Sequence, residues 1–345
     1  MTVDEIKARQ LAAQYLTRSG EMIDVAAGLC GVQAQFLPQA LHGLAIRSTD
    51  FSPALAQARL VKNRTLRGTL HIFPEEDQAL YLDPDLYRSH DWTIPDFWNS
   101  RPDWSLSPQR QELFTQVILN ALSGGPQTRE QLKDLCRTQG MTPAEEGSLF
   151  HPWGGGIRQL CQRGFLHYAV REEKTLCLSR LIPPLSREKS ALSRVKRALV
   201  HTCPTTVHDL MYFFRASSTQ VKGWLDQLPV RSIVCDGRTY FYSEGSPEPP
   251  DIPRCLFLAG FDQLLLSHEK KESLYLAPEH LRQVFSLAGI VSPTVLLDGI
   301  IAAKWQKKGH TVTVQPFVSL SASDRSAISQ AAESLWPDLK HLKFS

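Results

Sequence analysis

The chain has no apolar run long enough to cross a bilayer. A transmembrane helix needs about 20 consecutive apolar residues, and charged or polar side chains interrupt every run before that length. The N-terminal stretch MTVDEIKARQ carries acidic residues where a signal peptide carries only basic ones. We therefore expect a cytoplasmic protein without membrane contact.

Cysteine is scarce, and its pattern excludes several site types. The seven cysteines are odd in number and form no CxxC pair, so a disulfide framework is not expected. The His and Cys residues within 161–177 and 201–208 lack zinc-site spacing. Neither a Walker A motif nor GxSxG is present. We expect no metal and no cofactor.

The chain also has little excess of basic over acidic residues, and its formal net charge is only +3. That value does not by itself indicate a nucleic-acid partner. The basic residues nevertheless gather in two stretches. The stretch ARLVKNRTLRGTLHI holds Arg59, Lys62, Arg64 and Arg67 without an acid. The helical pattern SREKSALSRVKRALVH holds Arg187, Lys189, Arg194, Lys196 and Arg197. Each stretch alone is typical of a solvated surface as well as of phosphate contacts.

Helix starts are clearly marked. Three Ser-Pro or Thr-Pro pairs put a capping residue before a proline in the first turn, at Ser52, Ser107 and Thr142. Capping boxes are predicted for Thr142 with Glu145, Thr128 with Gln131, and Ser217 with Gln220. In the N-terminal third we expect helices near 4–17, 21–30, 36–47 and 52–62, followed by a strand at GTLHIF.

One pattern of elements occurs twice. Residues 106–183 read as three helices followed by the alternating stretch FLHYAVREEKTLCLS, and residues 184–245 repeat this order. Three helices followed by a hairpin are typical of a winged helix. Residues 1–105 offer a more elaborate first unit of this kind. After the linker SEGSPEPPDIPR, residues 254–345 predict a small β-rich, barrel-like domain with a helix near 324–335. The expected fold class is α+β.

The stretch GLCGVQAQFLPQ places two glutamines in otherwise apolar sequence, and about thirty residues later RGTLH follows. Together with FDQLLLSHEKK and GIVSPTVLLDGIIAAKW, these motifs resemble the winged-helix DNA glycosylases of the AlkZ and YcaQ kind over essentially the whole chain. The resemblance implies tandem winged-helix units in a C-shaped array around DNA. In the crosslink-repair branch typified by YcaQ, Asp replaces the second glutamine, so Gln35 places the chain on the AlkZ-like side. HEKK departs from the family pattern, in which an acid is followed by Arg.

The resemblance implies that Gln33 and Gln35 are the catalytic residues. Alkylation of a purine ring nitrogen makes the base a good leaving group that needs little acid catalysis. An amide carbonyl accepts a hydrogen bond from water and presents its negative end to a developing sugar cation. In a regular α-helix side chains at i and i+2 diverge. We therefore expect helical geometry to end near Gly31, with both glutamines on a connecting segment that faces the cleft. The alternative is that both amides satisfy backbone groups at a helix end.

The resemblance also assigns DNA contacts to the basic stretches. Arg67 would contact phosphate or base, and His71 would support the pocket; the alternative is a wing packed on its own core, with His71 hydrogen-bonded. For Asp262 we favour an acid that fixes a turn at the entrance of the barrel-like domain over a role in the cleft. The DNA-binding residues implied are Arg59, Lys62, Arg64, Arg67, His71, Arg187, Arg194, Lys196 and Arg197.

The function expected is that of a monofunctional DNA glycosylase, a monomer acting on double-stranded DNA with alkylated or crosslinked bases. It would hydrolyse the N-glycosidic bond of alkylated purines of the N7-alkylguanine type and open interstrand crosslinks. The alternative is a non-catalytic tandem winged-helix DNA-binding protein or transcription regulator, in which the glutamines are dispensable.

Overall fold

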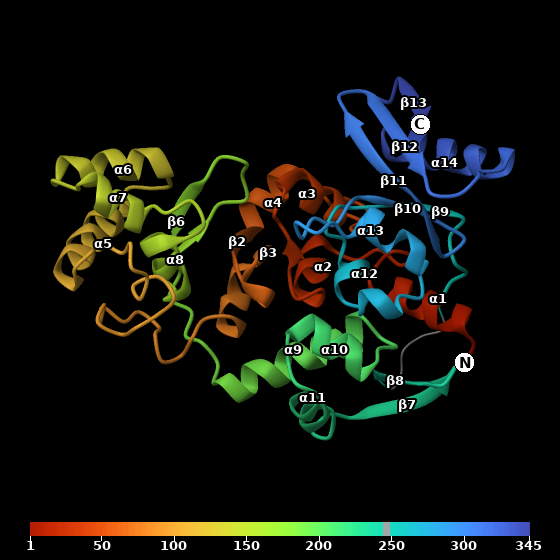
Figure 1. Ribbon diagram of the computed structural model, residues 1–345, viewed down its shortest axis with the longest axis horizontal. Coiled ribbons are helices and arrows are strands. Elements are labelled where there is room, and N and C mark those ends of the chain that lie inside the picture. Colours follow the sequence, from red (N-terminus) through yellow and green to blue (C-terminus); the bar gives the residue numbers. More distant parts are fainter. Residues whose placement is uncertain (244–248) are drawn as a thin grey trace. The chain divides into compact units, whose positions relative to one another are not determined.

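The computed structural model describes residues 1–243 and 249–345, which form two compact units (Figure 1). One unit comprises residues 1–53 and 194–345, and the other comprises residues 54–193. Residues 244–248, in the expected proline-rich linker, lie outside the described residues. Both units contain helices and strands, so the fold is α+β. Among the described helices, none combines the length and apolar character that a membrane span requires.

The unit of residues 54–193 begins with a helix that leads directly into a hairpin. Helix α4 (Pro53–Arg59) ends where strand β2 (Leu60–Arg64) begins, and β2 pairs antiparallel with β3 (Leu70–Pro74). The expected helix over 52–62 is therefore wrong in its last turn, because residues 60–62 are hydrogen-bonded in the sheet. The turns η1 (Leu66–Gly68) and η2 (Glu75–Leu80) flank β3.

The rest of this unit contains four helices and three strands: α5 (Pro108–Ser123), β4 (Gln127–Thr128), α6 (Arg129–Thr138), α7 (Pro143–Leu149), α8 (Gly155–Gln162), β5 (Leu166–Tyr168) and β6 (Thr175–Leu178). The predicted capping boxes at Thr128 and Thr142 are both confirmed. The strands of the unit lie in the order β3-β2-β5-β6-β4. Apolar side chains from the helices and from β5 and β6 form one core, which includes Phe114, Leu149 and Leu166.

The unit of residues 1–53 and 194–345 starts with short helices: α1 (Val3–Ala13), α2 (Met22–Gly28) and α3 (Leu37–Ala45), with strand β1 (Val32–Gln33) before α3. Each helix is shorter than expected. After α1, Tyr15 takes a left-handed backbone conformation with φ 61°, which cannot continue a helix. The same happens after α2, where Cys30 has φ 57° and Gly31 has φ 89°.

Helix α9 (Arg187–His201) begins in one unit and ends in the other. It is followed by α10 (Val207–Phe214), α11 (Ser218–Leu225) and the hairpin of β7 (Val230–Cys235) with β8 (Arg238–Ser243). Asp236 and Gly237 join the two strands, both with positive φ, as a tight two-residue hairpin turn requires. The predicted capping box at Ser217 is confirmed.

The C-terminal region is a five-stranded sheet with a helix beside it (Figure 1). Its strands lie in the order β13-β12-β11-β10-β9, and all neighbours are antiparallel except β12 and β13. The strands are β9 (Cys255–Leu258), β10 (Thr294–Leu297), β11 (Ile300–Lys308), β12 (Thr311–Pro316) and β13 (His341–Phe344). Helix α14 (Ala322–Leu335) packs Ile328 into the apolar cluster of this sheet. Two four-residue helices, α12 (Gln263–Leu266) and α13 (Leu281–Val284), lie between β9 and β10 in the chain.

Candidate active site and nucleic-acid interface

Gln33 and Gln35 lie outside the helices, as expected. Helix α2 ends at Gly28, Gln33 ends the short strand β1, and α3 begins only at Leu37. The two amides differ in exposure, since Gln33 is 6% exposed and Gln35 lies at the surface. The connecting segment of residues 29–36 therefore presents one buried and one accessible amide within three residues.

Helix α9 supports the start of this segment. The Arg197 guanidinium donates a hydrogen bond to the carbonyl of Ala27 (3.2 Å), one of the last carbonyls of α2. The His201 ring lies so close to Gly28 that a Cβ atom there would be 2.8 Å from it. Only glycine lets the end of α2 approach α9 this closely. Arg197, expected to bind DNA, thus also has a structural contact next to the two glutamines.

Asp262 forms a buried ion pair with Arg47, which follows α3. The Arg47 Nη2 to Asp262 Oδ1 distance is 2.6 Å, and both side chains are essentially inaccessible. The Asp262 carboxylate also accepts backbone N–H bonds from Ala259 (3.1 Å) and Leu264 (2.9 Å). This geometry agrees with the interpretation of Asp262 as the acid that fixes a turn.

The RTLRG turn between β2 and β3 gathers arginine side chains. Arg64 donates to the carbonyls of Gly68 (2.7 Å) and Trp153 (2.9 Å). Arg67 and Gly68 both have positive φ, which makes the turn tight. Arg158 of α8 lies against this turn, 3.6 Å from where a Cβ on Gly68 would be, and burial followed by the charge of Arg64 lowers its pKa.

His71 is completely buried in β3. Its Nδ1 lies 3.0 Å from the Thr69 carbonyl oxygen, and its Nε2 has no hydrogen-bond partner among the described residues. Burial, and then the charge of Arg67, lowers the pKa of His71 to about 3, so the ring is neutral at physiological pH. A neutral, buried imidazole supports the turn rather than contributing positive charge.

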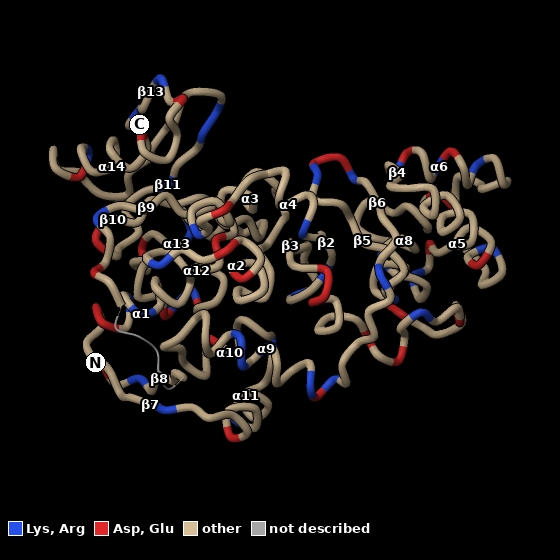
Figure 2. Tube along the Cα trace, turned by 180° about the vertical axis from the view of Figure 1, so that it is seen from behind, with Lys and Arg blue, Asp and Glu red and all other residues tan. Residues whose placement is uncertain are grey.

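The other expected DNA contacts have different environments. Arg59 and Lys196 are exposed, and Arg194 is partly exposed. Lys62 is buried and donates to the Arg171 carbonyl (2.8 Å), and burial lowers its pKa. Arg187 is exposed and forms ion pairs with Asp83 (2.8 Å) and Asp85 (2.6 Å). The basic residues are marked blue along the chain in Figure 2.

Sequence reasoning missed an exposed tryptophan beside the arginine-rich turn. The Trp153 side chain is 71% exposed, and its carbonyl accepts the Arg64 bond. The next residue, Gly154, packs on Trp98, over whose ring Arg158 lies at 5.9 Å. Trp153 belongs to the sequence stretch HPWGGG, which does not indicate which of its residues is exposed.

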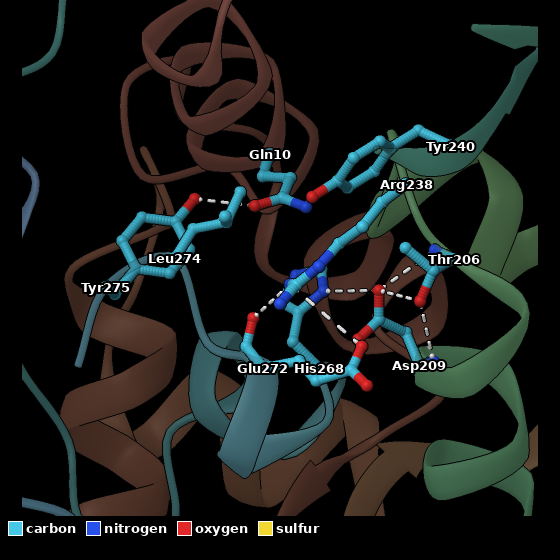
Figure 3. A pocket seen from close by; sticks show the side chains of 9 residues that line it. All are labelled: Gln10, Thr206, Asp209, Arg238, Tyr240, His268, Glu272, Leu274 and Tyr275. Atoms are coloured by element: carbon cyan, nitrogen blue, oxygen red, sulfur yellow. Dashed lines mark hydrogen bonds and ion pairs between the residues drawn. The ribbon is translucent and has the colours of Figure 1, made fainter. Parts of the chain in front are cut away.

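His268, the first residue of the HEKK stretch, lines a small polar cavity together with residues of α1, α10 and β8 (Figure 3). His268 Nδ1 lies 3.6 Å from Asp209 Oδ2, and the Glu269 backbone N–H donates to Asp209 Oδ1 (2.7 Å). Burial alone would raise the pKa of Asp209, but the hydrogen bond and charge of His268 keep it below its usual value. The cavity volume is about 10 Å³, enough for one water molecule and far too small for a base.

Among the residues that the structure describes, no group of three or more His, Cys, Asp or Glu side chains is placed to hold a metal ion.

Comparison with known proteins gives consistent matches. The family described as "DNA glycosylase AlkZ-like" matches residues 26–336. A curated protein of Streptomyces sahachiroi named "Interstrand DNA cross-link repair glycosylase" is 27% identical over 316 residues, which covers 85% of this chain and 84% of the relative. The solved structure "Streptomyces sahachiroi DNA glycosylase AlkZ" matches with a TM-score of 0.78 and 23% identity over 100% of this chain and 99% of that chain. The structural match shows a shared fold.

Proposed function

Because the chain belongs to the AlkZ-like DNA glycosylase family, we propose that it hydrolyses the N-glycosidic bond of alkylated purines of the N7-alkylguanine type in double-stranded DNA. The curated relative is named for interstrand crosslink repair, so we extend the proposal to crosslinked bases. Gln35 on the AlkZ-like side of the family is compatible with both substrates. The observation that carries the proposal is the placement of Gln33 and Gln35 on a non-helical segment, with Gln35 accessible.

In the proposed reaction, water attacks the sugar C1′ as the bond from C1′ to the base nitrogen breaks. The electron pair of that bond stays with the base and cancels the positive charge that alkylation gave it. Glutamine cannot take up a proton, so the proton of the attacking water passes to solvent. The Gln35 carbonyl oxygen accepts a hydrogen bond from the water, and Gln33 helps to stabilise the cationic sugar. The products are a free base and an abasic site.

We assign the DNA backbone to the basic surface of each unit. In residues 54–193 this surface consists of Arg59, Arg64, Arg67 and Arg158, with Trp153 placed to stack on a base or sugar. In the other unit it consists of Arg194, Lys196 and Arg197 on the second half of α9. Arg187 joins this surface only if it exchanges its aspartate partners for phosphate. Lys62 and His71, also expected to bind DNA, are buried, so we assign them to supporting the β2–β3 hairpin and not to phosphate contacts.

We further propose that the order of elements represents tandem winged helices. Residues 1–105, 106–183 and 184–245 would each form one winged helix, and residues 254–345 would form the C-terminal barrel-like domain. The run of α5, α6, α8, β5 and β6 supports the second unit, and α9, α10, α11, β7 and β8 support the third. A C-shaped array would keep the site open, as a crosslinked base that cannot swing freely from the duplex requires.

The test is base release from a duplex that carries a single N7-methylguanine, detected as strand cleavage by alkali. Ala at Gln33 or Gln35 should lower the single-turnover rate by about 10²-fold, the usual cost of removing one group that stabilises charge in the transition state. Gln330→Ala, which removes an exposed amide from α14, is the control and should keep the wild-type rate. A nitrogen-mustard crosslink is the second substrate. Binding without release from either substrate would refute the proposed function and favour a non-catalytic DNA-binding protein.

A further inference from the structure

The turn of residues 259–263 contacts the connecting segment of residues 29–36, called the glutamine segment below, at its start and just after its end. The Gln263 side-chain amide donates a hydrogen bond to the carbonyl of Leu29, the first residue of the segment (2.9 Å). The Gly260 backbone N–H donates to the Gln39 side-chain oxygen (2.6 Å) in the first turn of α3, just after it. A chain segment held at both ends has less freedom to move the residues in between.

The same turn also contacts the last residue of the segment, Phe36. The Phe261 ring centroid lies 6.0 Å from that of Phe36, the residue that follows Gln35. Phe261 is buried and has a left-handed backbone conformation with φ 55°, whereas Phe36 is 49% exposed. Phe36, the neighbour of Gln35, therefore packs against the ring of a buried residue of the turn.

The turn is itself held rigidly by the Asp262 carboxylate. Asp262 accepts hydrogen bonds from the backbone amides of Ala259, at the start of the turn, and Leu264, just after it, and pairs with Arg47. Arg47 in turn donates to the carbonyls of Gly43 (3.0 Å) and Gln14 (3.0 Å), so the turn is attached to α3 and to the end of α1. Gln263 therefore projects from a fixed support.

We infer that Gln263 is a positioning residue that holds the backbone before Gln33 and Gln35 in its reactive geometry. This inference rests on the proposed function. Gln263 does not touch the reacting atoms. Its effect passes through the Leu29 carbonyl into the segment, and misplacement of catalytic groups by about 1 Å is enough to lower a rate 10²-fold. Its loss should slow the chemical step without weakening DNA binding.

The test compares Gln263→Met with the control variant Gln10→Met. Gln10 is equally buried, and its side chain donates to the Pro204 carbonyl (2.6 Å) and accepts from the Tyr275 hydroxyl (2.9 Å), so it does not contact the turn of residues 259–263. Methionine preserves length and shape at both positions. It removes one bonded donor from residue 263 but a bonded donor and a bonded acceptor from residue 10, so Gln10→Met should lose at least as much stability.

Four quantities are measured in the full-length protein: thermal stability, hydrogen exchange of the amides of residues 29–36, the single-turnover rate of N7-methylguanine release, and the Kd for the same duplex. We expect Gln263→Met to speed exchange in this segment and to lower the release rate by about 10²-fold with an unchanged Kd. Gln10→Met should leave exchange in this segment and the release rate at wild-type values.

Each of the other possible results argues against the inference. Unchanged exchange in Gln263→Met would overturn the inference whatever the activity. Faster exchange with a wild-type release rate would show that the contact holds the segment but does not serve catalysis. Equal loss of activity in Gln263→Met and Gln10→Met would assign the effect to general destabilisation and overturn the inference. Absence of base release by the wild-type protein would refute the proposed function, and the catalytic role of Gln263 with it, while the exchange data would still report the contact.

Discussion

Replacing Asp262 by Asn should destabilise the protein strongly, although Asp262 touches no substrate in the proposed mechanism. The change removes the charge that compensates Arg47, whose side chain is 1% exposed and stays fixed by the Gly43 and Gln14 carbonyls. Breaking a buried ion pair by removing one partner costs about 3–5 kcal/mol. A domain is typically stable by only about 5–15 kcal/mol, so this loss is a large fraction of the total.

The measurement is thermal denaturation by circular dichroism at neutral pH. Asp262→Asn should lower the Tm by about 10 °C, which follows from a shift of about 2–4 °C per kcal/mol. Asp298→Asn is the control: Asp298 pairs with Arg254 at an exposed position, and its backbone φ of 45° suits Asn. Loss of that screened pair should cost less than about 1 kcal/mol. Adding Arg47→Met to Asp262→Asn should recover part of the lost stability by removing the uncompensated charge. Equal Tm values for the two Asp→Asn variants would refute this reasoning.

Three further predictions follow from buried and charged groups. Folding lowers the pKa of His71 from 6.5 to about 3. Between these pH values the unfolded chain binds a proton that the folded chain does not, so the free energy of unfolding decreases as pH falls from about 6.5 toward 3. His71→Asn should make the free energy of unfolding, measured by urea denaturation, less dependent on pH in this range. Arg64→Gln should weaken DNA binding and lower the slope of log Kd against log salt concentration by about 0.9, whereas Arg137→Gln, which removes a side chain paired with Glu146, should leave the slope unchanged. Burial raises the pKa of Cys136 and Cys161 to about 12, so mass spectrometry after iodoacetamide treatment of the native protein at pH 8 should find both unmodified, and modification of either would contradict their burial.

Local sequence signals predicted the helix starts well. The capping boxes at Thr128, Thr142 and Ser217 depend on residues three apart, so the sequence contains the whole interaction. Helix ends were less predictable. Residues 60–62 fit a helical pattern but pair with β3, and Tyr15 and Cys30 take left-handed conformations that no residue preference indicates. Strand β13 was missed because it is short and pairs with β12 in parallel.

The candidate site was predictable only in part. The spacing of Gln33 and Gln35 correctly indicated a non-helical segment, because side chains two residues apart diverge on a helix. The sequence could not show that Gln33 is buried while Gln35 is accessible. It also could not separate Lys62, whose ammonium group is bound to a backbone carbonyl, from the exposed Arg59 three residues earlier. Burial depends on tertiary packing, and both residues lie in the same basic stretch.

The contacts of Gln263, Phe261 and Gly260 with residues 29–39 join parts of the chain that lie more than 200 residues apart. No local pattern encodes such contacts, yet they hold the segment that carries the two proposed catalytic amides. In the proposed reaction this amide pair neither gives nor takes a proton, so it would act only through the orientation of its dipoles. Such a site would depend on the groups that fix that orientation. In this protein the short turn beside the proposed catalytic segment contains a buried glutamine, a phenylalanine with left-handed backbone geometry and one partner of a buried ion pair.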